Sequence, residues 1–544
     1  MRFRLRGMAA RLEPKALPTV GTEGKETART VVGRALLAER EQGPYFSLVL
    51  TGVFYLALCW VHGHHELWRD EMHSWNVARN AGGLWDLLVG VRRYEGHPFL
   101  WYYLLFLASR VSRSAACLHV ATVSFATLST YLWLRGSGLP RVLRVMLPFT
   151  YLYFFEYGAL SRCYAPGVFL AFLFCHLYDR ESLRLPRLLG VLFLLSFTSV
   201  YGAMMAASLA VFVLWHGGTR TWSVWRKTGN TRLLWQWWAP ALGLIALAII
   251  LHAMTSLPPS DAFFASPRGH NLSLTSANGP SRYFWAGLFP WDTQGAGDWI
   301  VSGYLGYGWS WFERLLPILA AVVLLLWLAA MRRAPSLVAV CLLGTVMMGL
   351  FQARQYLGFL RHWGHFFLFL VVCAWLLAKQ SGRSRKLMHL LLGATMAVQI
   401  VTAWRAVRIE LDRPFSGALE AANYLRDHDL AGEPVLATLD HAGAGVAGYL
   451  DRRFFYPESG IEAGDERQAV VFDSHRHDSP SPMGALYLAA KLARRIGSPV
   501  LLLLNLDLEG GTLPDVRIEL LHVTRPSVIS TERFWIYRVR LQPP

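Results

Sequence analysis

Long apolar segments recur along the first three-quarters of this chain and limit what it can fold into. Runs of mostly apolar residues, about as long as the ~20 residues that an α-helix needs to cross a bilayer, recur from Tyr45 to Trp404. The composition agrees, because 54% of the 544 residues are hydrophobic and only 16% are charged. A water-soluble globular protein does not have this composition. The sequence therefore predicts a polytopic α-helical membrane protein.

The loops between the apolar segments predict the orientation of the chain. Lys and Arg gather in three loops, at 220–232, 332–333 and 379–386, and such basic loops normally face the cytoplasm. The N-terminus would lie on the same side and the C-terminal region on the other, which requires an odd number of spans. We identify twelve candidates and therefore expect eleven or thirteen, with one broken, re-entrant or miscounted segment between His97 and Arg144, which leaves the number of spans between 97 and 158 open. The candidates are 45–63, 97–112, 116–134, 144–158, 164–178, 187–200, 202–216, 237–254, 313–331, 336–352, 362–378 and 387–404.

Changes in composition divide the chain into three parts. Residues 1–44 carry nine Lys and Arg against five Glu and are predicted to form a cytoplasmic basic tail that leads into an uncleaved first span. Residues 45–404 are the predicted transmembrane domain, with external loops at 64–96 and 255–312. Residues 405–544 mix polar and apolar residues and are predicted to form an external α/β domain. Its expected elements are helices at 416–430 and 484–496 and short strands at 434–440, 469–473 and 498–507.

Charge, cysteine content and one glycine-rich segment exclude other classes of protein. The net charge is +17, but the basic residues lie mainly in the N-terminal tail and in short loops, where the positive-inside bias explains them without nucleic acid. The six cysteines lie in or beside apolar segments without CxxC spacing, and we expect small core residues rather than disulfides or metal ligands. The segment TLDHAGAGVAGYL lacks GxGxxG spacing and is interpreted as a strand followed by a helix.

Two adjacent acids stand in the first external loop, in the segment ELWRDEMHSW. Asp70 and Glu71 lie among tryptophans just after the first predicted span, as expected for helices at the membrane interface. Two solvated loop acids would be the simpler interpretation of the pair alone. However, ionisable residues at the edge of the hydrocarbon usually face a cavity or a partner, and further polar residues stand at the ends of later spans. These are Glu95 and His97, then Glu156, Arg162 and Tyr164, and finally Arg361, His362 and His365.

These residue types divide between two chemical tasks. A carboxylate can take a proton from a hydroxyl group, and Arg and His can hold an anionic leaving group such as a phosphate. For Arg361, His362 and His365, interfacial anchoring competes with a role as a phosphate clamp. We favour the clamp because the positive-inside rule disfavours Arg on the external side. The predicted substrate is a phosphate carried at the membrane surface.

The arrangement resembles the GT-C superfamily of membrane glycosyltransferases, and within it the branch of protein O-mannosyltransferases and the lipid A aminoarabinose transferase. The resemblance rests on the Asp-Glu pair after the first span, on EGHPFLWYYLL, which is similar to the family's HPPL opening of the second span, and on the SR of YGALSRCYAPGVFLAFLF. Phe99 replaces the second Pro of many relatives, and SRCYA lacks the Asp that some relatives carry after SR. The likeness in sequence lies mostly within residues 66–178.

The resemblance implies a many-span fold with an external C-terminal α/β domain, and it implies roles for single residues. It assigns Asp70 to the activation of the acceptor hydroxyl. Glu71, the second candidate catalytic acid, would help to bind acceptor or sugar together with Glu95 and His97. Arg162 and Tyr164 are further candidates for substrate binding. Relatives of this branch are thought to work without a metal, and although an Asp-Glu pair could hold Mg²⁺ or Mn²⁺, no cofactor is firmly expected.

The predicted function is a glycosyltransferase that moves a hexosyl or pentosyl group from a polyprenyl-phosphate-linked donor to a hydroxyl of a lipid, glycan or protein, with inversion. Nucleotide sugars stay in the cytosol, whereas lipid-linked sugars can be presented outside, here at a bacterial inner membrane among membrane lipids. A flippase for lipid-linked sugars would be expected to show broken or charged spans and an internal repeat, and no convincing repeat is seen. A glycan polymerase or ligase would use similar chemistry and stays open.

Overall fold

The computed structural model describes most of the predicted membrane and C-terminal regions. The described residues are 44–179, 185–229, 231–262, 279–290, 310–356, 358–380, 385–459, 470–473 and 476–542. The predicted basic tail at 1–44 lies outside them except for Pro44, and so do 263–278 and 291–309 of the predicted loop 255–312.

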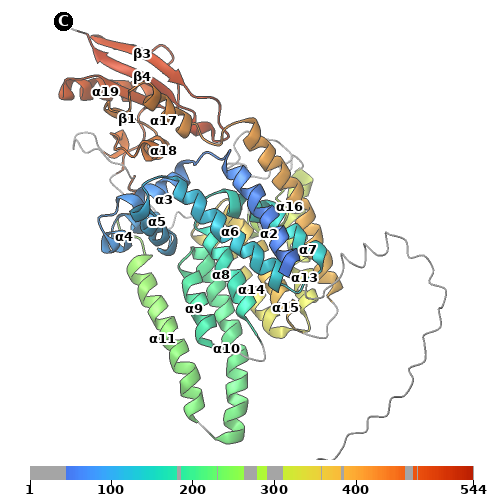
Figure 1. The fold of residues 1–544 in the computed structure, drawn as a ribbon. Coiled ribbons are helices and arrows are strands. Elements are labelled where there is room, and N and C mark those ends of the chain that lie inside the picture. The colour runs from blue at the N-terminus through green and yellow to red at the C-terminus, as the bar shows by residue number, and fades with distance from the viewer. Residues whose placement is uncertain are drawn as a thin grey trace, which may run out of the picture.

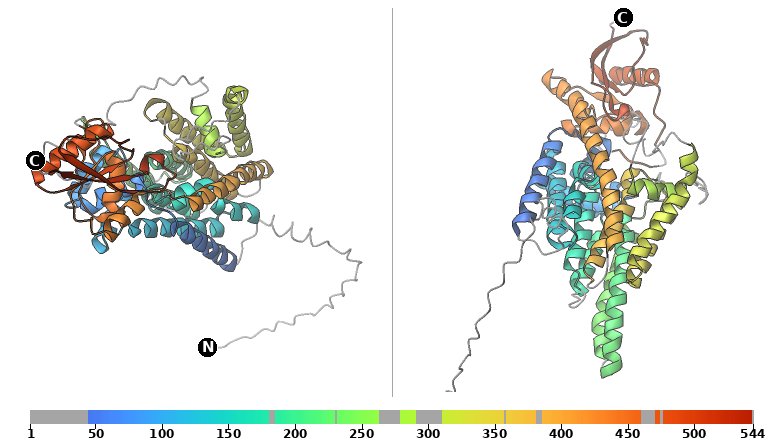
Figure 2. Two further views of the ribbon diagram at one scale, coloured as in Figure 1. Left: turned by 90° about the horizontal axis from the view of Figure 1, so that it is seen from above. Right: turned by 90° about the vertical axis from the view of Figure 1, so that its right-hand side faces the viewer.

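A bundle of apolar helices forms the membrane part of the chain, and Figures 1 and 2 show the C-terminal domain at one end of it. Among the described residues, eight helices are long and apolar enough to cross a membrane, and three further apolar helices are shorter. The chain is therefore a multi-pass helical membrane protein, as predicted. The long helices are α2 (Pro44–His62), α6 (Ala116–Gly136), α10 (Val200–Thr228), α11 (Thr231–Thr255), α13 (Ser310–Met331), α14 (Pro335–Arg354), α15 (Leu360–Ala378) and α16 (Lys386–Asp412), and the short ones are α5 (Leu100–Val111), α8 (Tyr164–Leu177) and α9 (Leu185–Ser196).

Helix α15 lies in the interior of the bundle. Of its most apolar 18-residue stretch, 94% is buried. The helix packs against α8, α10, α14 and the short helix α12 (Pro280–Leu288). A helix that is apolar on all sides is expected to be buried, and this one is rich in Phe, Leu and Val. Its first turn carries Arg361 and His362, so the most enclosed helix of the bundle positions two of the predicted site residues.

The segment predicted as a span at 144–158 is broken. It forms α7 (Arg141–Met146), a short 3-10 turn at Leu147–Phe149 and a π-helix at Tyr151–Ala159. Pro148 lies in the 3-10 turn, where its missing N–H and its ring interrupt the α-helical hydrogen bonds. We expected the irregular segment between His97 and Arg144, but the break begins only at the end of that region and lies mostly beyond it. The prediction of a regular span at 144–158 is therefore wrong.

The first external loop folds into α3 (Arg69–Asn80), α4 (Leu84–Val89) and a 3-10 helix at Val91–Glu95. On α4, Leu84 and Trp85 are exposed, as expected for a helix at the membrane interface. Helix α3 differs, because its residues from Glu71 to Arg79 are all buried. The interfacial position of α4 stays a prediction that its exposed apolar side chains fit, whereas α3 is covered by the C-terminal domain.

The C-terminal domain is a small α/β unit beyond the end of α16. Its four-stranded sheet has the order β1-β2-β4-β3, with β1 and β2 parallel and the other pairs antiparallel. Residues 470–473 form no strand and contribute an isolated bridge between Asp473 and Ala262, so the strand predicted at 469–473 is wrong over its described part. The elements are α17 (Ala418–Asp427), β1 (Val435–Ala437), α18 (Asp440–Leu450), α19 (Pro482–Ile496), β2 (Val500–Leu504), β3 (Val516–Val523) and β4 (Trp535–Leu541).

Helix α18 docks this domain directly onto α3 of the membrane domain. Asn76 donates from Nδ2 to the carbonyl of Ala444 at 2.9 Å, and the hydroxyl of Tyr449 accepts from the backbone N–H of Leu67 at 2.8 Å. A side chain at Gly448 would collide with Met72, so this glycine permits the close approach of the two helices. The glycine-rich segment at 438–450 forms the turn after β1 and helix α18, so the strand-to-helix interpretation is confirmed. This helix packs on α3, which carries Asp70.

Candidate functional site

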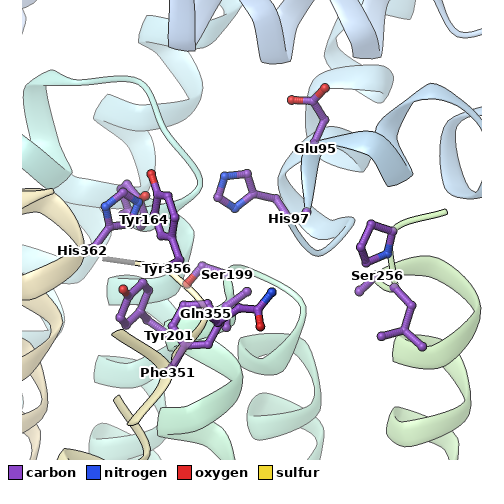
Figure 3. Close-up of a pocket in the computed structure, with 14 residues that line it drawn as sticks. Glu95, His97, Tyr164, Ser199, Tyr201, Ser256, Phe351, Gln355, Tyr356 and His362 are labelled. Atoms are coloured by element: carbon purple, nitrogen blue, oxygen red, sulfur yellow. The ribbon is translucent and has the colours of Figure 1, made fainter. Parts of the chain in front are cut away.

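Two adjoining cavities lie where the C-terminal domain meets the bundle. The first, about 310 Å³ in volume, is lined by charged residues of α3, the chain before α5, the start of α15 and the C-terminal domain, and we call it the polar cavity. The second, about 330 Å³, lies among the ends of α10, α11 and α14, where Val200, Leu257, Pro258 and Phe351 line it together with polar residues. We call it the apolar cavity because, unlike the first, it has no Arg in its lining. Both are lined by Glu95, His97, Tyr356 and His362. In Figure 3, Glu95 and His97 approach the apolar cavity from one side, and Tyr164 and His362 lie across from them.

Asp70 lies in the polar cavity between two arginines. Its Oδ2 is 2.9 Å from Nη2 of Arg361 and 3.6 Å from Nη1 of Arg162, and Arg162 also donates to the backbone carbonyl of Asp70. Burial alone would raise the pKa of Asp70, but the two guanidinium groups outweigh it and hold this pKa at about 2. The structure thus brings together three predicted site residues from separate external segments, and Asp70 is ionised in the ligand-free protein.

Glu71, by contrast, points away from both cavities into the protein. One carboxylate oxygen accepts from the backbone N–H of Ser161, and the other accepts from His65 Nε2 at 2.9 Å and from the N–H of Trp68 at 3.2 Å. His65 in turn contacts the carboxylate of Glu410 on α16. Burial would lower the pKa of His65, but its two carboxylate neighbours raise it well above its usual value. Glu71 therefore fixes the start of α3, and the prediction that it acts in catalysis or touches the substrate is not supported by its position.

A second acid in the polar cavity lies beside a histidine that the sequence did not indicate. Glu95 Oε1 lies 2.7 Å from Nε2 of His73, which is on α3 one turn after Asp70. Although burial opposes the charge, Glu95 raises the pKa of His73. His97 behaves differently, because burial and the nearby Arg162 lower its pKa to about 3. The polar cavity thus combines a close His–Glu contact with a histidine of low pKa, and both predicted residues Glu95 and His97 line it.

The predicted clamp on α15 is divided between the cavities and the protein interior. Arg361 lines the polar cavity and His362 lines both cavities. His365 lines neither; its ring stacks on Tyr201 at 4.7 Å between ring centroids, and its Nδ1 lies 3.1 Å from the carbonyl of His362. The prediction that His365 binds the substrate directly is therefore replaced by a packing role.

Tyr164 lines the apolar cavity, as a substrate-binding residue would. Glu156 is buried on the π-helix and accepts a hydrogen bond from Tyr151; it lines neither of the two cavities. These two residues lie in the same sequence segment, and only the first of them reaches the site.

The C-terminal domain supplies three cavity residues that no sequence pattern indicated. These are His441, Phe472 and Arg476, which line the polar cavity together with Asp70, Arg162 and Arg361. Tyr102, Tyr356 and Phe359 of the membrane domain also line it. Only the docking of α18 on α3 brings these distant parts of the chain together.

No resident metal is indicated by the ligand types at the site. Within the described segments, no group of three or more His, Cys, Asp or Glu residues has a metal-binding arrangement. Asp70 is engaged by two arginines and Glu71 by three donors, so the two acids do not converge on a common point.

The fold and the two cavities define a multi-pass membrane protein with a charged site at one end of its bundle. No protein-family model and no curated protein sequence matches the chain. It is similar to a crystal structure of ArnT from Cupriavidus metallidurans bound to undecaprenyl phosphate, with a TM-score of 0.42 and 14% identity over 91% of this chain and 98% of that one. The apo structure of the same protein gives a TM-score of 0.39 and 13% identity over 90% and 97%. At these values we infer the function from this chain's own residues.

Proposed function

We propose that this protein is a glycosyltransferase that moves a sugar from a polyprenyl-phosphate carrier to an acceptor hydroxyl at the external membrane face. The observation that carries the proposal is a carboxylate, Asp70, held between Arg162 and Arg361 where a polar cavity adjoins an apolar one. A lipid-borne phosphosugar has a matching division into a charged head and an apolar tail. The motif resemblance to GT-C enzymes supports the same proposal.

The charges at the site favour an anionic leaving group. Asp70 neutralises one of the two arginines that face it. One positive charge therefore remains between Arg162 and Arg361, which suits the phosphate of the carrier, because guanidinium groups bind phosphate through charge-assisted hydrogen bonds. The apolar cavity beside them, with Tyr201, Leu257 and Phe351 in its lining, would take the first isoprene units.

In the proposed reaction, the acceptor oxygen attacks the anomeric carbon of the donor sugar. The new C–O bond forms while the bond between that carbon and the phosphate oxygen breaks, and its electron pair leaves with the phosphate. The hydroxyl proton passes to the carboxylate of Asp70, and the products are a glycoside and polyprenyl phosphate. Attack from the face opposite the phosphate would invert the anomeric configuration. Arg162 and Arg361 stabilise the charge that develops on the leaving group.

The location of the site distinguishes this proposal from a flippase. The cavity residues come from the ends of helices on the side of the C-terminal domain, whereas transporters bind their substrate near the middle of the bilayer. The hairpin of α10 and α11 extends away from that domain (Figure 1), and its basic end would face the cytoplasm under the positive-inside rule.

The decisive experiment compares the wild type with Asp70→Asn. The amide keeps the shape but is not a base, so turnover should fall about 10²–10⁴-fold. Binding of undecaprenyl phosphate should stay the same or become tighter, because the substitution removes the carboxylate that competes for Arg162 and Arg361.

The assay would use purified protein in lipid nanodiscs with a panel of synthetic polyprenyl-phosphate sugars and the cell's own glycolipid fraction as acceptor. Full transfer by Asp70→Asn, or a wild type that binds no polyprenyl phosphate, would contradict the proposal. Net movement of donor across sealed vesicles without transfer would favour the flippase instead.

A further inference from the structure

We propose that His441, Phe472 and Arg476, which we call the domain wall, bind a sugar ring of the acceptor and orient its hydroxyl toward Asp70. This inference rests on the proposed function and extends it, since it assigns the acceptor to the C-terminal domain and to the class of carbohydrates. The domain wall and Asp70 line the same polar cavity of about 310 Å³.

Arg476 is held rigidly in this wall. Its Nε and Nη2 donate to the two carboxylate oxygens of Asp440 at 2.8 and 2.5 Å, and Asp440 is fully buried at the start of α18. Burial would raise the pKa of Asp440, but His441 and Arg476 hold it at about 2, so the pair stays ionised. A guanidinium fixed in this way presents its remaining N–H groups in a fixed direction, as recognition of hydroxyl groups requires.

His441 is oriented by the same carboxylate. Its backbone N–H donates to Asp440 Oδ1 at 2.6 Å, and its Nδ1 lies 3.1 Å from the same oxygen. When Nδ1 carries the proton for this contact, Nε2 at the other edge of the ring can accept from a hydroxyl. One buried acid thus sets the direction of two cavity residues.

Phe472 adds an aromatic face between the two domains. Its ring meets the ring of His73 edge to face at 5.4 Å between centroids, and the guanidinium of Arg476 lies 5.5 Å from its centre. It is only partly buried and lines the cavity. An aromatic surface beside fixed donors and acceptors suits a sugar ring, which has apolar C–H faces and polar edges.

The charge of the domain wall argues against a second phosphate. Asp440 neutralises Arg476, whereas Arg162 and Arg361 share the single carboxylate of Asp70. The excess positive charge of the arginines therefore lies on the membrane-domain side of the polar cavity. A neutral sugar ring fits this wall, and the carrier phosphate fits the arginines opposite.

The test uses the full-length protein in nanodiscs with Phe472→Leu and Arg476→Lys. Leucine keeps apolar bulk without the aromatic face, and lysine keeps the charge beside Asp440 without the planar fork. The acceptor probes are the octyl glycosides of glucose, galactose, mannose and arabinose. Both variants should raise the KM for the accepted glycoside roughly three- to tenfold and leave undecaprenyl phosphate binding unchanged. Tyr487→Leu and Arg517→Lys, at exposed positions of the same domain, serve as matched controls.

The outcomes separate this inference from the proposed function. Three outcomes would overturn the acceptor assignment alone. The first is an unchanged glycoside KM in both variants, and the second is an equal loss of donor and glycoside affinity. The third is a wild type that binds undecaprenyl phosphate but transfers sugar to none of the four glycosides. A wild type that binds no undecaprenyl phosphate would overturn the proposed function, and the acceptor assignment with it.

Discussion

Replacing Glu71 by glutamine would test whether the second acid of the Asp-Glu pair acts on the protein rather than on the substrate. The carboxylate accepts from three donors: the N–H of Ser161, the N–H of Trp68 and Nε2 of His65. Glutamine has a single acceptor oxygen and brings two N–H donors of its own. At least one of the three buried donors must therefore lose its acceptor.

The expected cost follows from these contacts. A buried donor without a partner costs about 1–3 kcal/mol, and a hydrogen bond to a charged group contributes about 1.5–3 kcal/mol. The two costs overlap, because the lost contact with His65 enters both of them. We therefore expect a total cost of about 3 kcal/mol, which shifts the equilibrium between the native and the displaced position of α3 roughly a hundredfold. Asp70 is the neighbouring residue on α3, so kcat should fall while KM for donor and acceptor changes little.

The assay is thermal unfolding followed by tryptophan fluorescence, together with turnover, for Glu71→Gln, Glu410→Gln and the double variant. Both acids contact His65, so their effects should be non-additive by about 0.5–3 kcal/mol. Glu66→Gln is the matched control at pH 6. Burial raises the pKa of Glu66 to about 7, so at pH 6 the neutral amide replaces a mostly protonated acid and should change stability little. An unchanged unfolding midpoint together with a raised acceptor KM would refute this reasoning and would indicate that Glu71 contacts the substrate.

Three further predictions follow from the same contacts. Arg361→Ala should weaken undecaprenyl phosphate binding about ten- to a hundredfold through one lost charge-assisted contact, measured in nanodiscs, whereas a loss confined to acceptor affinity would contradict the clamp. On acidification, kcat should begin to fall at a higher pH than kcat/KM for the donor does. The reason is that bound phosphate would draw the arginines from Asp70 and raise the pKa of Asp70 from about 2. If kcat and kcat/KM fell together in profiles measured between about pH 4 and 8, this coupling would be excluded. A membrane-impermeant maleimide should label Tyr487→Cys but not Arg226→Cys in intact cells, and the reverse pattern would invert the topology.

Much of the fold follows from hydrophobic patterning, and the exceptions have physical causes. Apolar length alone predicts the long spans, because a bilayer requires it. The segment 144–158 has the same apolar character, but Pro148 breaks it. Strands β3 and β4 were not predicted, although the alternation in VRIELLHV and WIYRVRL is a strand signal. Residues 470–473 show the opposite error, since a short apolar run does not specify a strand without a neighbouring strand to pair with.

The site was predictable where residue chemistry was unusual for its location. Asp70 and Arg361 are 291 positions apart in sequence and form an ion pair, and both were recognised as charges at the ends of spans. Glu71 lies outside the cavity that Asp70 lines because adjacent helical side chains point about 100° apart, so neighbours in sequence need not share a cavity. His441 and Arg476 could not be found in this way, because only the docking of α18 on α3 brings them to Asp70.

The pairing of Asp70 with Arg162 and Arg361 also bears on when Asp70 can act as a base. A carboxylate with a pKa of about 2 is a weak base, so in the ligand-free site it would activate neither water nor an acceptor. On the proposed function, a donor phosphate that takes over the two guanidinium groups removes the charges that lower this pKa, and Asp70 becomes a stronger base only when a sugar is present to be transferred. The same two arginines would then hold the leaving group and control the base, which explains why one carboxylate faces two cations at the opening of the apolar cavity.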